Sequence, residues 1–165
     1  MRDDSAQLLD CLPRLRRYAR ALLGDRSEAD DLVQDTVERA WKRLSSWRQG
    51  SDMRPWLFSI MHNLHVDRLR RPAPELVALS EDLVQSTPST GTLELRELDA
   101  ALPLLPPEQR EVLLLVALEE MTYEEVAATL GIPPGTVMSR LSRARERLRL
   151  LMLGHPVPVP LKVVK

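Results

Sequence analysis

Apolar side chains recur every three or four residues along most of this chain, and no other feature constrains its fold as strongly. That step places them on one face of an α-helix, whereas a half-buried strand needs strict alternation. Leu, Ala, Arg and Glu dominate the composition, and only 4% of the residues are aromatic. Because straight-chain side chains lose little rotamer freedom in a helix, the composition agrees with the period. We therefore expect an all-α protein.

A proline-rich segment divides the expected helices into two groups. Three prolines lie with Ser, Thr and Gly in residues 72–91, a composition that cannot propagate a regular helix. A chain of 165 residues can hold one ordinary domain or two small ones. We expect two small helical domains, 1–71 and 92–153, joined by this segment as an acidic flexible linker. Residues 154–165 alternate proline with valine, and we expect a disordered tail in preference to a docking peptide.

Three helices are expected in the first domain. The first covers residues 8–24, and Pro13 delays or bends its start. The second opens at Ser27, whose hydroxyl can cap free backbone amides. The third covers residues 55–71, after a loop over residues 45–52 that has no apolar period.

The tryptophans of this domain differ in their expected surroundings. Trp41 and Trp56 lie on the apolar stripes of two expected helices, so we expect both in the core. Trp47 lies in the loop, where it is either a core residue or a platform on which a base stacks. Cys11, the single cysteine, lies among apolar positions and cannot form an internal disulfide. We expect it to be a small core residue and not a redox sensor.

Four helices are expected in the second domain. Thr92 can cap the first, and the prolines at 106–107 separate it from the second. Thr122 begins a T-x-x-E capping box that opens a short third helix, which closes at Gly131. Pro134, at a first-turn position, opens the fourth. A short helix, a glycine turn and a second helix form the plan of a helix-turn-helix.

The last expected helix has an apolar face and a basic face. Its apolar positions follow the helical step and are Val137, Leu141, Ala144, Leu148 and Leu151. Its opposite side carries small polar side chains and arginines, namely Thr136, Ser139, Arg140, Arg143 and Arg147. Such side chains can contact base edges in the major groove and neutralise phosphates, as a DNA-binding helix requires. A solvated basic face on an ordinary bundle is the alternative.

Charge is distributed unevenly along the chain, whose net charge is −1. Residues 1–71 carry 14 basic and 11 acidic side chains, residues 72–132 carry 2 and 12, and residues 133–165 carry 7 and 1. Five arginines and one glutamate fall within residues 140–149. Because this basic block coincides with the last periodic helix, it favours duplex DNA as a partner.

Four motifs resemble a known family in their order and spacing. They are SEADDLVQDTVERAW (27–41), RPWLFSIMHNLHVDRLRR (54–71), LPPEQREV (105–112) and GTVMSRLSRAR (135–145). Over residues 8–150 the chain resembles the extracytoplasmic-function (ECF) group of bacterial sigma factors. The resemblance implies core RNA polymerase and promoter DNA as partners, and an anti-sigma protein as a regulator. It implies promoter-specific initiation of transcription as the function.

The resemblance also implies a surface for the polymerase. In this family the second helix of the first domain docks on the clamp helices of the β′ subunit, and the β subunit is a further contact. The matching outward positions are Asp31, Gln34, Asp35 and Glu38. Carboxylates and an amide on one face suit an arginine-rich partner surface, although a plain solvated face is the alternative.

Two DNA surfaces are implied in the same way. For the unwound −10 element the positions are Asn63, Asp67, Arg68, Arg70 and Arg71. An amide can pair with an exposed base edge, and arginines can hold phosphates. For the −35 duplex the positions are Thr136, Met138, Ser139, Arg140, Ser142, Arg143 and Arg147. Family members often have Lys or Arg where this chain has Met138, so the −35 sequence does not follow from the resemblance.

Other function classes find no support in the sequence. It has no Gly-rich phosphate loop and no nucleophile with a matching base, so we expect neither an enzyme nor a cofactor. His62 and His65 have no third metal ligand nearby. No apolar run approaches the roughly 20 residues of a membrane span, and we expect a cytoplasmic protein. The alternatives are a DNA-binding regulator that never joins polymerase and an all-α interaction protein or enzyme.

Overall fold

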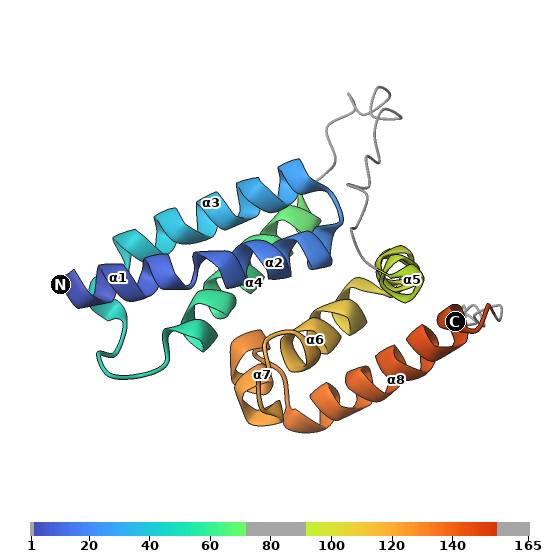
Figure 1. Cartoon of the computed structure of the whole chain (residues 1–165). Helices are drawn as coiled ribbons and strands as arrows, with labels where there is room; N and C mark the ends of the chain where they lie inside the picture. The colour runs from blue at the N-terminus through green and yellow to red at the C-terminus, as the bar shows by residue number, and fades with distance from the viewer. Residues whose placement is uncertain (1, 72–91, 155–165) are drawn as a thin grey trace.

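The computed structural model describes residues 2–71 and 92–154, which form two helical domains (Figure 1). The N-terminal domain contains α1 (Arg2–Asp10), α2 (Leu12–Leu23), α3 (Arg26–Lys42), the 3-10 turn η1 (Leu44–Ser46) and α4 (Met53–Arg70). The C-terminal domain contains α5 (Leu93–Ala101), the 3-10 turn η3 (Leu102–Leu104), α6 (Pro107–Ala117), α7 (Tyr123–Leu130) and α8 (Pro134–Met152). The all-α, two-domain expectation is confirmed. The expected linker and the tail from residue 155 lie outside the described residues.

The first expected helix is in fact two helices. α1 ends at Asp10 and α2 begins at Leu12, with Pro13 in its first turn, where a missing N–H leaves no hydrogen bond unmade. α2 ends at Gly24, whose φ of 75° is left-handed and whose N–H donates to Arg20 O at 2.9 Å. The break lies at Cys11, so the proline starts a new helix instead of bending one.

The cap of α3 differs from the prediction. The helix begins at Arg26, and the Asp25 side chain accepts a hydrogen bond from the Glu28 N–H at 3.1 Å. Ser27 lies inside the first turn and is exposed. Both Asp and Ser are favourable caps, so the type of residue alone could not decide between them.

The core of the N-terminal domain lies between α2, α3 and α4. Tyr18 of α2 and Phe58 of α4 meet edge to face, with ring centroids 4.9 Å apart. Around this pair lie fully buried apolar side chains, including Leu15, Leu22, Leu32, Leu57 and Met61.

One tryptophan that we expected to find buried is not in this core. The prediction for Trp41 is wrong, because the side chain is 57% exposed on α3. Leu69 of α4 is also exposed, whereas Trp56 is partly buried against the core. Trp47 is buried at 5% exposure, which favours the core alternative for this residue over base stacking.

The helix-turn-helix of the C-terminal domain follows the predicted signals closely. Thr122 Oγ1 accepts from the Glu125 N–H at 3.2 Å and caps α7. Gly131 ends α7 with a left-handed φ of 67°, and the Ile132 N–H donates to Ala127 O at 3.1 Å. Pro134 is the first residue of α8. The capping box and the glycine turn therefore place α8 as the second helix of the motif.

The two domains pack against each other through α2 and α4 on one side and α6 and α7 on the other. The buried apolar side chains of both domains belong to one continuous cluster. Within residues 2–71 and 92–154, none of the helices is both long and apolar enough to cross a bilayer.

Candidate nucleic-acid and polymerase interface

The predicted duplex-binding residues lie on one side of α8. The other side buries Val137, Leu141 and Ala144 against the rest of the domain. Met138, Ser139, Ser142 and Arg143 are exposed, and Thr136, Arg140 and Arg147 are half-buried. The apolar period thus orients the whole set away from the core.

The arginines of this face have no carboxylate partners among the residues that the structure describes. Within α8, an ion pair joins Arg149 to Glu146, with Nη2 and Oε1 2.7 Å apart. Neither of these residues belongs to the predicted set. The guanidinium groups of Arg140, Arg143 and Arg147 are therefore available to an external anion such as a DNA phosphate.

The predicted −10 residues lie along the C-terminal half of α4. Asn63, Asp67, Arg70 and Arg71 are exposed. Arg68 is half-buried, and its Nη2 pairs with Oδ2 of Asp35 on α3. The structure therefore joins one residue predicted to bind the −10 strand to one predicted to bind the polymerase. Sequence spacing alone does not indicate this pair, because 33 positions separate its members.

The predicted polymerase-binding residues share the outer face of α3. Asp31, Gln34, Asp35 and Glu38 are all exposed. Glu38 Oε1 lies 3.1 Å from Lys42 Nζ, one turn further along the helix. The face is thus predominantly acidic and accessible to solvent.

A groove of about 920 Å³ lies beside this face, between α2 and α3. Gln34, Glu38 and Trp41 line it from α3, and Leu12 and Arg16 line it from α2. Trp41 therefore belongs to a surface and not to the core. The apolar period missed this because Trp41 occupies the edge of the stripe, where a helical residue can face either the core or a partner.

Histidines and a glutamate meet where the two domains touch. His62 Nδ1 of α4 contacts Oε1 of Glu111 on α6. His65 is buried, and this burial lowers the pKa of its imidazole. His62 thus has a carboxylate partner in the other domain, and its place is in the domain contact.

Arg110 is a further residue whose role the sequence analysis missed. Its guanidinium donates to Leu102 O, Pro103 O and Leu105 O at 2.8 Å each, and to Leu22 O of α2 at 2.7 Å. The first three carbonyls belong to its own domain and the last to the other. A single side chain thus satisfies backbone groups on both sides of the domain contact.

Cys11 is half-buried between α1 and α2. Burial and the neighbouring Asp52 carboxylate raise the pKa of its thiol, although Arg14 and Arg54 oppose the shift. A raised pKa keeps the thiol protonated and unreactive, in agreement with a structural role.

Comparisons with known proteins assign both domains. Residues 8–62 match the family model described as the Sigma2 domain of PhyR, and residues 95–148 match Sigma-70, region 4. Over 156 residues the chain is 38% identical to the ECF RNA polymerase sigma factor EcfG of Rhodopseudomonas palustris, covering 92% of this chain and 84% of that protein. The chain belongs to the ECF sigma factor family. ECF sigma factors act in promoter-specific transcription initiation by RNA polymerase.

Two solved structures resemble this one over both domains. The sigma factor RpoE from Bartonella quintana, in complex with the anti-sigma factor NepR, is 35% identical, with a TM-score of 0.79 over 93% of this chain and 98% of that chain. CnrH in complex with the cytosolic domain of CnrY is 30% identical, with a TM-score of 0.69 over 94% and 90%. The two-domain helical fold described above is thus shared with experimentally determined structures.

Proposed function

We propose that this ECF sigma factor binds core RNA polymerase through α3, anchors on −35 duplex DNA through α8 and holds the melted −10 strand through α4. The observation that carries the proposal is the exposed face of α8, where Arg140, Arg143 and Arg147 lack acidic partners among the described residues. Arginines in this setting can contact guanine edges and phosphates in the major groove.

The −10 contact is inferred for α4 because its exposed end combines an amide with arginines. Asn63 can pair with the edge of an unstacked base, and Arg70 and Arg71 can neutralise the phosphates of the same strand. Arg68 joins them once it leaves Asp35. The domain limits that follow are 1–71 for polymerase and −10 binding and 92–153 for −35 binding.

The polymerase contact is inferred for the acidic face of α3 together with its neighbouring groove. Asp31, Gln34 and Glu38 offer hydrogen-bond acceptors to a basic partner helix, and Trp41 offers an apolar anchor. Aromatic anchors surrounded by polar groups are typical of the residues that dominate binding energy. We therefore add Trp41 to the proposed β′ contact surface.

An anti-sigma protein is a further proposed partner. The structures of RpoE and CnrH that resemble this chain contain NepR and CnrY, respectively. Both relatives are at least 30% identical over nearly the whole chain, which supports a partner of the same kind here.

Reconstituted transcription tests this function. Core polymerase is incubated with the chain and fragmented genomic DNA, and the transcripts are sequenced. We expect discrete start sites that share two upstream elements, and the sites should vanish when Arg140 and Arg143 are both changed to Ala. Absence of binding to core polymerase, or the same transcripts from core alone, would contradict the proposal.

A further inference from the structure

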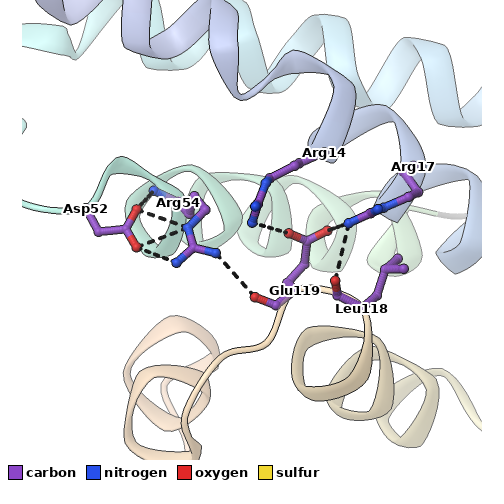
Figure 2. A network of polar contacts seen from close by, with 6 residues as sticks. All are labelled: Arg14, Arg17, Asp52, Arg54, Leu118 and Glu119. Atoms are coloured by element: carbon purple, nitrogen blue, oxygen red, sulfur yellow. Dashed lines mark hydrogen bonds and ion pairs between the residues drawn. The ribbon is translucent and has the colours of Figure 1, made fainter.

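A buried acidic residue lies where the domains meet, in the turn between α6 and α7. The Glu119 side chain is 0% exposed. Its nearest cations come from α2, where Arg14 Nη1 lies 3.7 Å from Oε2 and Arg17 Nη2 lies 3.6 Å from Oε1 (Figure 2). Within the described ranges, neither carboxylate oxygen has a donor closer than 3.5 Å. The charge of Glu119 is therefore paired only over distances longer than the roughly 2.7–2.9 Å of a good charged hydrogen bond.

The backbone of the same turn has its own donors. Arg17 Nη2 donates to Leu118 O at 3.3 Å, and Arg54 Nη1 of α4 donates to Glu119 O at 3.4 Å (Figure 2). Asp52 holds the Arg54 guanidinium in place, with Oδ2 and Nη2 2.7 Å apart. None of these contacts involves the Glu119 carboxylate, so they do not require a charge on residue 119.

Burying a carboxylate without short hydrogen bonds is unfavourable, and attraction to nearby arginines often does not offset the loss of water. Arg14 and Arg17 are about half exposed, so they keep much of their own hydration and screen the attraction further. In agreement with this balance, burial raises the pKa of the Glu119 carboxyl, although Arg17, Arg14 and Arg54 oppose the shift. The closed domain contact thus disfavours the ionised form of Glu119.

The proposed function requires the two domains to separate, and the inference below rests on that function. Elements centred near −35 and −10 lie about 25 base pairs apart, or roughly 85 Å along B-DNA at 3.4 Å per base pair. A compact chain of 165 residues has a radius of gyration of roughly 15 Å and is about 40 Å across. The stretch between Arg71 and Thr92 can reach at most roughly 70 Å. The closed arrangement cannot contact both elements, whereas separated domains can.

We propose that Glu119 keeps the domain contact reversible: its buried carboxylate, paired only over 3.6 and 3.7 Å, weakens the closed arrangement enough for the domains to separate on polymerase and promoter. Glu119 is a positioning residue, because it acts on the placement of the domains and contacts neither DNA nor polymerase. Arg17 and Arg54 bind the backbone of the turn between α6 and α7, and the buried carboxylate reduces the net stability of this contact.

A rescue experiment on the full chain tests this role. Spin labels are attached at exposed positions 45 and 145, through Ser45→Cys and Arg145→Cys in a Cys11→Ser background, and double electron–electron resonance measures the ratio of closed to open molecules. Arg17→Gln leaves the buried carboxylate with less compensation, and we expect the closed-to-open ratio to fall roughly tenfold. Adding Glu119→Gln to that variant should raise the ratio again by roughly three- to tenfold.

Glu120→Gln provides the matched control, since Glu120 is the exposed neighbour of Glu119 in the same turn. Added to Arg17→Gln, it should leave the ratio unchanged. Thermal unfolding of every variant verifies that both domains stay folded. If Glu119→Gln fails to restore closure, or opens the molecule further, the carboxylate is a net attachment and the proposal is wrong.

A second measurement separates this proposal from the proposed function. In the otherwise unchanged chain, Glu119→Gln should lower the fraction of open molecules. The affinity for core polymerase should fall by the same factor, because only open molecules bind. Rescue of closure without any effect on polymerase binding would retain the role of Glu119 in the domain contact. It would overturn the proposed link between opening and polymerase binding, whereas the transcription experiment above decides the two-element function.

Discussion

Arg110 illustrates how a single side chain can join two domains. Its planar guanidinium donates to four carbonyl oxygens at once, one of which belongs to Leu22 in the N-terminal domain. Burial lowers the pKa of this arginine, but the group is still charged at any physiological pH. A lysine offers a compact ammonium in place of a fork of donors, and it cannot reach four carbonyls in this geometry.

Arg110→Lys is therefore expected to destabilise the chain by about 2 kcal/mol, since two or more carbonyls lose their donors. Urea denaturation monitored by circular dichroism measures the change. Arg96→Lys is the control, because Arg96 is exposed on α5 and should change the free energy of unfolding by less than about 0.5 kcal/mol. Equal effects of the two substitutions would contradict the structural role of Arg110.

Trp41 is the residue for which surface exposure matters most. Trp41→Ala should weaken binding to core polymerase roughly tenfold or more if the side chain anchors the partner. The free energy of unfolding should fall by less than about 1 kcal/mol, because 57% of the side chain is already exposed. Biolayer interferometry with immobilised core measures the affinity. Leu93→Ala, a change at a 71% exposed apolar residue on α5, should leave it unaltered. A large decrease in the free energy of unfolding with no loss of affinity for core polymerase would show that Trp41 acts as a core residue and would contradict its role as an anchor.

At the scale of single elements, most of the helices were predictable, although the first one is two helices, and their caps were only partly predictable. Thr122 and Gly131 bound α7 as expected, because the capping box and the glycine act through bonds within a few residues. The cap of α3 was misplaced by two positions, from Asp25 to Ser27. Here several polar residues follow one another, and packing of the first turn decides which of them becomes the cap.

The two candidate caps of α3 can be compared directly. Asp25→Ala should lower the free energy of unfolding by about 1 kcal/mol, since the Glu28 N–H loses its acceptor. Ser27→Ala should change it by less than about 0.5 kcal/mol, because this exposed side chain lies within the first turn. Chemical denaturation of both variants under one set of conditions tests the difference. A larger loss of stability for Ser27→Ala than for Asp25→Ala would show that Ser27 is the cap, as the sequence suggested.

The faces of α3 and α8 show what an apolar period in the sequence can predict about burial and what it cannot. It correctly orients Val137, Leu141 and Ala144 of α8 to the interior, so the predicted DNA-binding set lies outside. It fails for Trp41, because the period gives the direction of a stripe but not its width. The width of the buried stripe depends on how closely neighbouring helices approach.

For the whole molecule, the domain contact implies a dependence on pH. The Glu119 carboxyl lies beside Arg14 and Arg17 of α2 and interacts electrostatically with Arg54 of α4 and Tyr18 of α2, and its burial raises its pKa in the closed form. In the open form the carboxyl is in water, where its ordinary pKa is 4.5. The closed form therefore binds the proton more tightly, and acidification favours closure.

The closed-to-open ratio should consequently rise as the pH falls from neutral through the raised pKa, and should level off below the ordinary pKa of Glu. Resonance distances recorded across this pH range in the Arg17→Gln background provide the measurement. The same titration of the Arg17→Gln, Glu119→Gln double variant removes the contribution of this carboxyl, and the difference between the two curves isolates it. If the difference between the curves shows that Glu119 lowers the closed-to-open ratio as the pH falls, the inference is wrong.

The sequence by itself determined the all-α class, the division into two domains, the helix-turn-helix and the positions of the candidate surfaces on their helices. These properties depend on local periodicity, capping and charge, all of which act over a few residues. Only the tertiary structure decided that Asp35 pairs with Arg68, that Arg110 joins the domains and that Glu119 is buried between them. Such contacts join residues 33 to 102 positions apart, and their formation depends on how finished helices pack in three dimensions, which no local pattern encodes.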